Sequence, residues 1–395
     1  MSVDRPPPGY RRGSTLIVVA LAVGLLLPWL AGDPAGGGLE NRRSAEFPDL
    51  SARGLLDTAT YRQADAALRD RLRLRTTITG QVGKQGIDRL GASMNDRVVV
   101  GDDGDLFGSE GFTIPCTYKR RFDIEATARA LTSWSRLAAA HDRQLLYAIA
   151  PSKATVRREK LSRYPTSLTE CSDRVRAQIR STWGPSGDST MLLIWDELRK
   201  LDQATSGQAY QVGDSHWTTV GASVLASRLV EAVPGPAIDV GDDFAPDRTT
   251  RRRGGLYRQL GFSRADVIPV VSPGRDGVHT VLSVAPTSSG RGLRTFTSRS
   301  TTQRLHPGRT LVIHDSFATA LAPVVAPYFR EISFLHWTDF AALVRSGQPM
   351  PTFDRLVIES TEAGFTQKSV DFLSTPRVHA AIMSALTRDS VCCDS

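Results

Sequence analysis

Short apolar runs, bounded by turn residues, alternate along the chain with segments whose apolar residues recur at helical spacing. We predict buried β-strands at residues 97–100, 145–150, 191–195, 310–313, 332–335 and 356–358. We predict helices at residues 55–74, 124–141, 221–233 and 317–329. Apolar strands separated by helices are typical of a parallel sheet covered on both faces. The pattern therefore predicts an α/β fold.

One stretch departs from this alternation of strands and helices. Between residues 266 and 284, Val and Ile alternate with polar residues. This period of two is typical of half-buried strands in antiparallel pairs. We therefore predict a small antiparallel, β-rich insertion in the parallel fold.

The N-terminal region contains an uncharged apolar run of 17 residues at 15–31. This length is at the short end of what spans a bilayer. Arg5, Arg11 and Arg12 precede the run, which favours a cytoplasmic N-terminus. We predict a single-pass anchor in the cell membrane, a cytoplasmic tail at 1–14 and an extracytoplasmic remainder. A cleaved signal peptide is the alternative, because small residues follow the run.

Composition narrows the possible partners and cofactors. The net charge is +8 and is carried mainly by arginine. No basic stripe with interleaved aromatic residues appears, so we predict no nucleic-acid binding. The charge either attracts anionic glycans or lipid headgroups, or only reflects compositional bias. The histidines lack the spacing of metal ligands, and no nucleotide-binding motif occurs, so we predict no metal and no cofactor.

A candidate nucleophile stands where a predicted strand ends and a predicted helix begins. Ser316 follows His314 and Asp315 directly after the apolar run at 310–313. Ligands bind at the carboxyl ends of strands in such sheets, and the first N–H groups of a helix can stabilise an oxyanion. Serine is also a favoured helix N-cap, so a structural role is the alternative.

A candidate base and its carboxylate partner lie in a second loop. Asp214 and His216 precede the helix predicted at 221–233. A serine hydroxyl needs a base to attack a carbonyl at neutral pH, and a carboxylate orients the imidazole. Each residue alone could be an ordinary loop residue. Ser316, His216 and Asp214 together supply the three roles of a catalytic triad.

Several blocks, in this order along the chain, resemble the SGNH hydrolase-like domain of alginate O-acetyltransferases of the AlgX/AlgJ type. Residues 98–107 resemble its VVxGxDGWLF block, 150–165 its PxKxTVYxExLP segment, 210–217 its YxxxDTHWT block, and 314–317 its GDSF block. With the ENRR and FP residues at 40–48, the blocks cover roughly residues 40 to 362. The ordered set is more specific than any one block.

The resemblance implies an SGNH hydrolase-like acetyltransferase domain at 54–390, joined to the anchor by a stalk at 32–53. It implies that Ser316 is the nucleophile, His216 the base and Asp214 the residue that orients it. A membrane-bound O-acyltransferase would deliver the acetyl group, and a hydroxyl of an exported or cell-surface polysaccharide would accept it. The resemblance also suggests four further substrate or oxyanion contacts: Tyr210, Ser152, Lys153 and Asp315.

The chain departs from the family pattern at three positions, which bear on substrate contacts more than on the triad. Asp105 stands in place of a tryptophan, His314 in place of a glycine, and Ser152 where the family often has asparagine. For Tyr210, core packing is the alternative to a substrate contact.

Two other functions fit the same residues. A carbohydrate acetylesterase would use water as the acceptor, and it would differ only in how the site excludes water. A non-catalytic, glycan-binding subunit of an export complex would need no nucleophile. A disulfide between Cys116 and Cys171 is possible in an oxidising compartment, and two separate thiols are the alternative.

Overall fold

The computed structural model describes residues 46, 48, 57–71, 73–93, 95–112, 124–185, 187–287, 290–365 and 375–387. The chain forms two compact units. The smaller unit comprises Met1–Val100 and Arg253–Arg264, and the larger comprises Gly101–Arg252 and Ala265–Ser395. Every described residue that the sequence suggests for the site lies in the larger unit.

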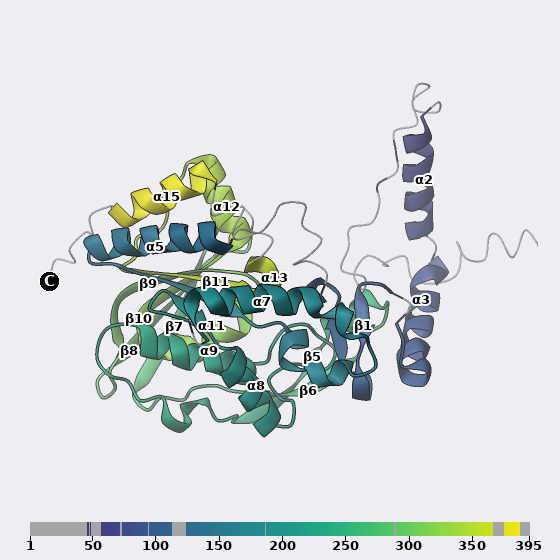
Figure 1. Ribbon diagram of the computed structural model, residues 1–395, viewed down its shortest axis with the longest axis horizontal. Coiled ribbons are helices and arrows are strands. Elements are labelled where there is room, and N and C mark those ends of the chain that lie inside the picture. Colours follow the sequence, from purple (N-terminus) through teal and green to yellow (C-terminus); the bar gives the residue numbers. More distant parts are fainter. Residues whose placement is uncertain are drawn as a thin grey trace, which may run out of the picture. The chain divides into compact units, whose positions relative to one another are not determined.

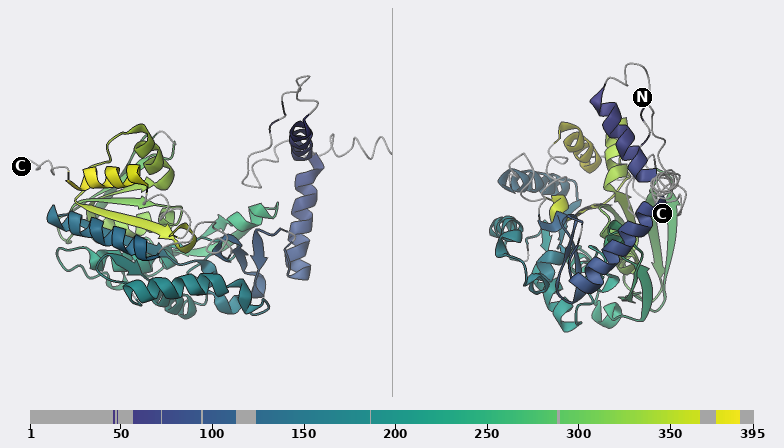
Figure 2. Two further views of the ribbon diagram at one scale, coloured as in Figure 1. Left: turned by 45° about the horizontal axis from the view of Figure 1, so that its top comes forward. Right: turned by 90° about the vertical axis from the view of Figure 1, so that its right-hand side faces the viewer.

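A seven-stranded sheet with the order β4-β3-β11-β9-β10-β8-β7 forms the centre of the larger unit (Figure 1). Five strands are parallel: β4 (Met191–Leu193), β3 (Gln144–Ala150), β11 (Arg355–Thr361), β9 (His306–His314) and β10 (Phe329–His336). At one edge, β8 (Leu293–Ser300) and β7 (Val278–Ala285) run antiparallel. The strands are twisted relative to one another (Figure 2), as in other sheets.

The central strands bury both of their faces. On β3, Leu145 and Tyr147 belong to one apolar core, whereas Leu146 and Ala148 belong to the other. Successive side chains of a strand point to opposite faces, so a strand between two cores must be apolar at every position. This requirement explains the continuous apolar runs in the sequence.

Helices cover both faces of the sheet. One core contains residues of α8 (Trp195–Ala204), α9 (Thr219–Ala232) and α11 (Ala318–Val325). The other contains residues of α5 (Ile124–Ala140), α7 (Glu170–Trp183), α12 (Trp337–Ser346) and α15 (Pro376–Thr387). Figure 1 shows α5 and α15 above the sheet and α8 and α9 below it. The predicted α/β architecture is confirmed, with a mixed rather than a parallel sheet.

The stretch between residues 266 and 284, predicted as one β-rich insertion, divides between two sheets. β6 (Ala265–Val270) pairs with β5 (Arg248–Arg253) in a separate two-stranded sheet, whereas β7 extends the main sheet. β7 is exposed along most of its length. The alternation of residue types could not distinguish an inserted hairpin from an edge of the main sheet, because both are partly exposed.

The helix predicted at 317–329 is too long. α11 ends at Val325, a short 3₁₀ turn (Ala326–Tyr328) follows, and Phe329 already belongs to β10. Pro327 lacks the backbone N–H that a further turn of α11 would need as a hydrogen-bond donor.

In the smaller unit, the helix predicted at 55–74 corresponds to α2 (Thr58–Arg71), and α3 (Arg73–Gln85), which was not predicted, follows it. The smaller unit also contains β1 (Val98–Val100) and α10 (Gly255–Gln259). Gly80 and Gly83 of α3 lie against backbone, where an added Cβ would come within 2.5 Å of the Gly261 oxygen and 2.3 Å of the Leu260 oxygen. Glycine is therefore required at these two helical positions.

The predicted anchor at 15–31 and its cytoplasmic tail lie outside the described residues, as does the stalk except for Glu46 and Pro48. None of the helices in the described part of the chain combines the length and the hydropathy of a transmembrane span.

We predict that Gly221→Ala destabilises the larger unit. Gly221 lies in the first turn of α9, and an added Cβ would come within 2.4 Å of the Ala209 carbonyl oxygen and 2.9 Å of the Trp217 Cβ. Overpacking of this kind costs about 1–3 kcal/mol. The free energy of unfolding is measured by urea titration with near-UV circular dichroism.

The control is Gly274→Ala, where an added Cβ would meet nothing closer than 4.0 Å. This change should alter the free energy of unfolding by less than about 0.5 kcal/mol. Equal unfolding midpoints for the two variants would show that α9 does not depend on this close approach.

Candidate active site

The turn after β9, which we call the nucleophile turn (residues 315–317), is held by the carboxylate of Asp315. Its Oδ1 accepts the Phe317 N–H at 2.9 Å, and its Oδ2 accepts the Thr361 N–H at 2.8 Å. The turn is thereby fixed both to the start of α11 and to the end of β11. Ser316 itself is exposed, so the hydroxyl stands at the carboxyl edge of the sheet, where ligands bind in this class of fold.

The segment before α9, residues 207–217, carries the imidazole and is called the base loop. Thr218 ends it by capping α9, since its Oγ1 accepts the N–H groups of Val220 and Gly221. The loop is joined to the nucleophile turn by Trp217, whose indole Nε1 donates to the Phe317 carbonyl at 2.8 Å. The rings of His216 and Phe317 also pack with their centroids 4.9 Å apart. These contacts fix the two segments to each other.

Asp214, His216 and Ser316 form a continuous hydrogen-bonded series. His216 Nδ1 lies 2.6 Å from Asp214 Oδ1, and His216 Nε2 lies 2.8 Å from Ser316 Oγ. The same Asp214 oxygen accepts the His216 backbone N–H at 3.0 Å. An Nδ1–H that donates to the carboxylate leaves the Nε2 lone pair facing the serine hydroxyl. Both distances lie in the range needed for proton transfer between neighbours.

The side chain of Asp214 is more buried than that of His216. The side chain of Asp214 is 12% exposed and that of His216 is 36% exposed. The carboxylate is thus shielded, whereas the edge of the imidazole next to Ser316 is open to an incoming molecule. The Ser316 backbone N–H has no partner in the described part of the chain, and it lies just before the N-terminus of α11. This N–H is available to a developing oxyanion.

Two of the four further residues suggested by the sequence are buried. Tyr210 is 2% exposed, and its hydroxyl donates to the Pro151 carbonyl at 2.7 Å. Lys153 is 3% exposed, and its ammonium contacts Asp105 and backbone carbonyls of the base loop. Both side chains are thus engaged within the protein, and neither is directed to solvent at the site.

The other two suggested residues also have internal partners. The Ser152 N–H donates to Glu362 Oε2 at 2.7 Å, and its hydroxyl caps the short helix α6 (Lys153–Val156). The Ser152 N–H is therefore not available to an oxyanion in this structure. The Asp315 carboxylate joins the start of α11 to the end of β11 through the two hydrogen bonds described above.

A fully buried carboxyl that the sequence pattern did not single out lies behind the nucleophile turn. Glu359 of β11 is fully buried, and its Oε2 accepts the Asp315 N–H at 3.1 Å. Neither carboxylate has a salt bridge to a Lys or Arg in the described residues. Burial and the adjacent Asp315 raise the pKa of Glu359 well above its ordinary value, and burial also raises the pKa of Asp315.

The signal that could have revealed Glu359 is an acidic residue directly after a buried apolar run in β11. Its neighbours Leu356, Val357 and Ile358 are all buried. A charged residue among them must pair, bind a metal or hold a proton. In the described part of the chain, no group of three or more potential ligands could hold a metal ion, and the raised pKa of Glu359 favours the protonated form of this carboxyl.

Cys171 is disulfide-bonded. Its partner lies outside the described residues, as does Cys116, so the pairing of these two cysteines remains a prediction.

We predict that Glu359→Gln makes the protein more stable than the wild type at neutral and alkaline pH. The folded wild type holds a proton that the unfolded chain releases above the ordinary glutamate pKa, so its stability falls as pH rises through that range up to the folded-state pKa. Glutamine needs no proton. The difference in unfolding free energy should grow by up to about 1.4 kcal/mol per pH unit.

Urea unfolding between pH 5 and pH 8 measures this difference. The control is Glu331→Gln on β10, a partly exposed strand position, which should not change the pH dependence in this way. Parallel stability curves for Glu359→Gln and the wild type would mean that Glu359 is ionised in the folded protein.

Comparison with known proteins gives a family match over part of the chain. Residues 98–291 match the family model of the SGNH hydrolase-like domain of the acetyltransferase AlgX. This range contains Asp214 and His216 but ends before Ser316. None of the curated proteins matches the sequence.

Solved structures give distant matches. Bacillus cereus PatB1 is 13% identical and aligns over 69% of this chain and 97% of its own, with a TM-score of 0.48. The O-acetyltransferase domain of Pseudomonas putida AlgJ is 19% identical and aligns over 73% of this chain and 99% of its own, with a TM-score of 0.40. Pseudomonas aeruginosa AlgX is 15% identical and aligns over 76% of this chain and 70% of its own, with a TM-score of 0.39.

All three TM-scores are below 0.5, so the assignment depends on the family match to this chain. The matched residues 98–291 contain the blocks at 98–107, 150–165 and 210–217, whereas the block at 314–317 lies outside the match. Residues 98–291, slightly less than half of the chain, are thus similar to the SGNH hydrolase-like domain of AlgX/AlgJ-type acetyltransferases.

Proposed function

We propose that this protein is a polysaccharide O-acetyltransferase that works through an acetyl-serine intermediate on Ser316. The observation that carries the proposal is the hydrogen-bonded series Asp214–His216–Ser316 at the carboxyl edge of the sheet. The family match supports acetyl transfer as the reaction class. The acceptor would be a hydroxyl of an exported or cell-surface polysaccharide.

In the first half-reaction, His216 Nε2 removes the proton from the Ser316 hydroxyl while Oγ attacks the acetyl carbonyl carbon. Asp214 stabilises the imidazolium that forms. The carbonyl oxygen becomes an oxyanion, which accepts a hydrogen bond from the Ser316 N–H at the start of α11. The tetrahedral adduct then collapses, His216 returns the proton to the departing donor group, and the acetyl group remains on Ser316.

In the second half-reaction, a sugar hydroxyl occupies the place that the donor group left. His216 removes its proton, the sugar oxygen attacks the acetyl carbon, and Ser316 Oγ departs and takes the proton back. Water in the same position would give acetate, which is the acetylesterase reaction. The partly exposed His216 ring leaves access for an acceptor at this point.

The predicted anchor and donor complete the proposal. The anchor at 15–31 would hold the domain at the outer face of the membrane. There, a membrane-bound O-acyltransferase would supply the acetyl group to Ser316.

We predict that Ser316→Ala abolishes turnover of 4-nitrophenyl acetate by the full-length chain. Loss of the nucleophile should reduce kcat/KM by on the order of 10³-fold or more. The wild type should also gain the mass of a sulfonyl adduct after treatment with a serine-reactive sulfonyl fluoride, and Ser316→Ala should not. The control Ser227→Ala, on the exposed side of α9, should behave as the wild type in both assays. Equal turnover by Ser316→Ala would refute the assignment of the nucleophile.

A second prediction separates transfer from hydrolysis. With an acetyl ester as donor and an oligosaccharide as acceptor, mass spectrometry should detect an oligosaccharide that carries one additional acetyl group. Formation of that product should require Ser316. Release of acetate alone, across neutral and uronic-acid oligosaccharides, would assign the protein as an esterase.

A further inference from the structure

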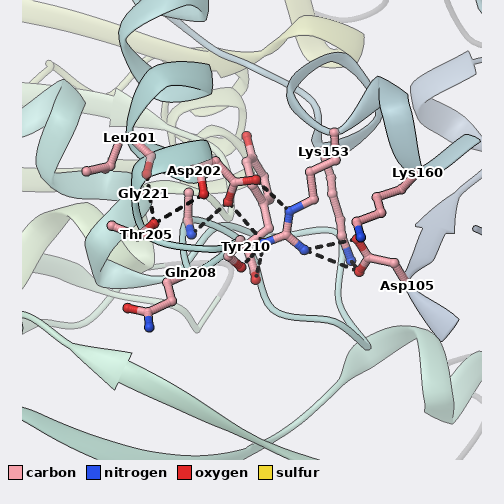
Figure 3. Close-up of polar contacts among 12 residues, drawn as sticks. Asp105, Lys153, Lys160, Leu201, Asp202, Thr205, Gln208, Tyr210 and Gly221 are labelled. Carbon is pink, nitrogen blue, oxygen red and sulfur yellow. Dashed lines mark hydrogen bonds and ion pairs between the residues drawn. The ribbon is translucent and has the colours of Figure 1, made fainter. Parts of the chain in front are cut away.

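Four charged side chains lie together in the interior, next to the base loop. Asp105, Lys153, Arg157 and Asp202 are each at most 4% exposed. Lys153 Nζ lies 2.6 Å from Asp105 Oδ1, Arg157 Nη1 lies 3.0 Å from Asp105 Oδ2, and Arg157 Nε lies 2.9 Å from Asp202 Oδ2. Figure 3 shows this cluster, with Asp202 at one end and Asp105 at the other. The two cations and two carboxylates balance in charge.

The cations also hold the backbone of the base loop by its carbonyl oxygens. Lys153 Nζ donates to the carbonyls of Gln211 and Val212 at 2.8 Å, and it lies 3.5 Å from that of Asp214. Arg157 Nη2 donates to the carbonyls of Tyr210, at 2.9 Å, and Gly207. These five carbonyl contacts span the loop up to the residue that orients His216.

The carboxylate end of the cluster holds the same loop from the other side. Asp202 Oδ1 accepts the Ala209 N–H at 2.9 Å. The Tyr210 ring lies beneath the Arg157 guanidinium, with the guanidinium carbon 5.8 Å from the ring centroid. The loop has almost no regular secondary structure, and its buried backbone groups need partners. The cluster supplies them.

Fold stability alone is a weak explanation for such a cluster. Taking charges out of water is costly, and apolar residues of similar volume often give equal or greater stability. The cost is visible at Lys153, where burial outweighs the attraction of Asp105 and lowers the pKa to about 8. Apolar side chains, however, cannot bind several carbonyl oxygens that converge on one point.

We propose that Lys153 and Arg157, supported by Asp105 and Asp202, are positioning residues that fix the base loop so that Asp214 and His216 are aligned with Ser316. The inference rests on the proposed function of those three residues. A general base must be held to a fraction of an ångström, and a displacement of about 1 Å can reduce turnover on the order of 10²-fold. The cluster acts through the loop and makes no contact with the acetyl group.

The test compares Lys153→Met with Lys160→Met in the full-length chain. Lys160 also forms a 2.6 Å ion pair, with Asp103, but at the surface. Lys153→Met should lower kcat for 4-nitrophenyl acetate by about 10- to 100-fold and change KM less than about threefold. Lys160→Met should keep both constants within about twofold of the wild type. All assays are made at a temperature where circular dichroism shows each variant to be fully folded.

A spectroscopic measurement distinguishes positioning from a general loss of structure. The proton between His216 Nδ1 and Asp214 should give a low-field NMR resonance in the wild type and in Lys160→Met. It should be lost or shifted in Lys153→Met while the remaining amide spectrum stays that of a folded protein. An unchanged resonance together with wild-type kcat in Lys153→Met would overturn the proposal.

Asp202→Asn decides the question if Lys153→Met does not fold. Asparagine keeps the size and one acceptor oxygen, and it weakens the hold on Arg157 and Ala209, so a smaller fall in kcat of about 3- to 10-fold is expected. If neither variant folds, the cluster holds the whole domain rather than the loop, and the proposal fails. If the wild type itself forms no sulfonyl adduct, the proposed function fails. If the wild type forms the sulfonyl adduct but the variants keep the wild-type kcat, only the positioning role is overturned.

Discussion

The contact on which the site depends is the hydrogen bond between His216 and Ser316, two residues 100 positions apart. Neither loop could maintain it alone. The serine is fixed by the end of β9 and by the Asp315 carboxylate, which reaches β11. The imidazole is fixed by Asp214 and by the base loop. The indole of Trp217 then joins the two segments through the Phe317 carbonyl, so the distance between hydroxyl and imidazole is set by packed structure.

Buried charge supports both halves of the site, in two different ways. Behind the nucleophile turn, Asp315 and Glu359 have no Lys or Arg ion pair in the described residues, and burial beside Asp315 raises the pKa of Glu359 well above its ordinary value. Beneath the base loop, Lys153 and Arg157 neutralise two carboxylates and bind backbone carbonyls as well. In both places a costly buried group fixes backbone that has no regular hydrogen-bond ladder.

Much of the fold could be predicted from local pattern. The central strands appear as apolar runs because both of their faces are covered, and α5 and α9 were predicted within a few residues. Antiparallel pairing of β7 was predicted, but not its place at the edge of the main sheet, because an exposed alternating strand fits an inserted hairpin equally well. The helices α7 and α8 were also missed, since only a few of their residues are buried and most of their sequence is polar.

The sequence by itself determined the candidate residues: a serine after a buried strand, and an aspartate and a histidine two residues apart in a loop before a helix. Residue type and spacing suffice for that, because strand ends and helix starts are local features. Only the tertiary structure decided that these residues meet, that Lys153 and Tyr210 are directed into the interior, and that Glu359 lies behind the nucleophile. Those outcomes depend on which strands are neighbours and on the hydrogen-bond partners of each buried polar atom. Both are set by the packing of segments that are distant in the sequence.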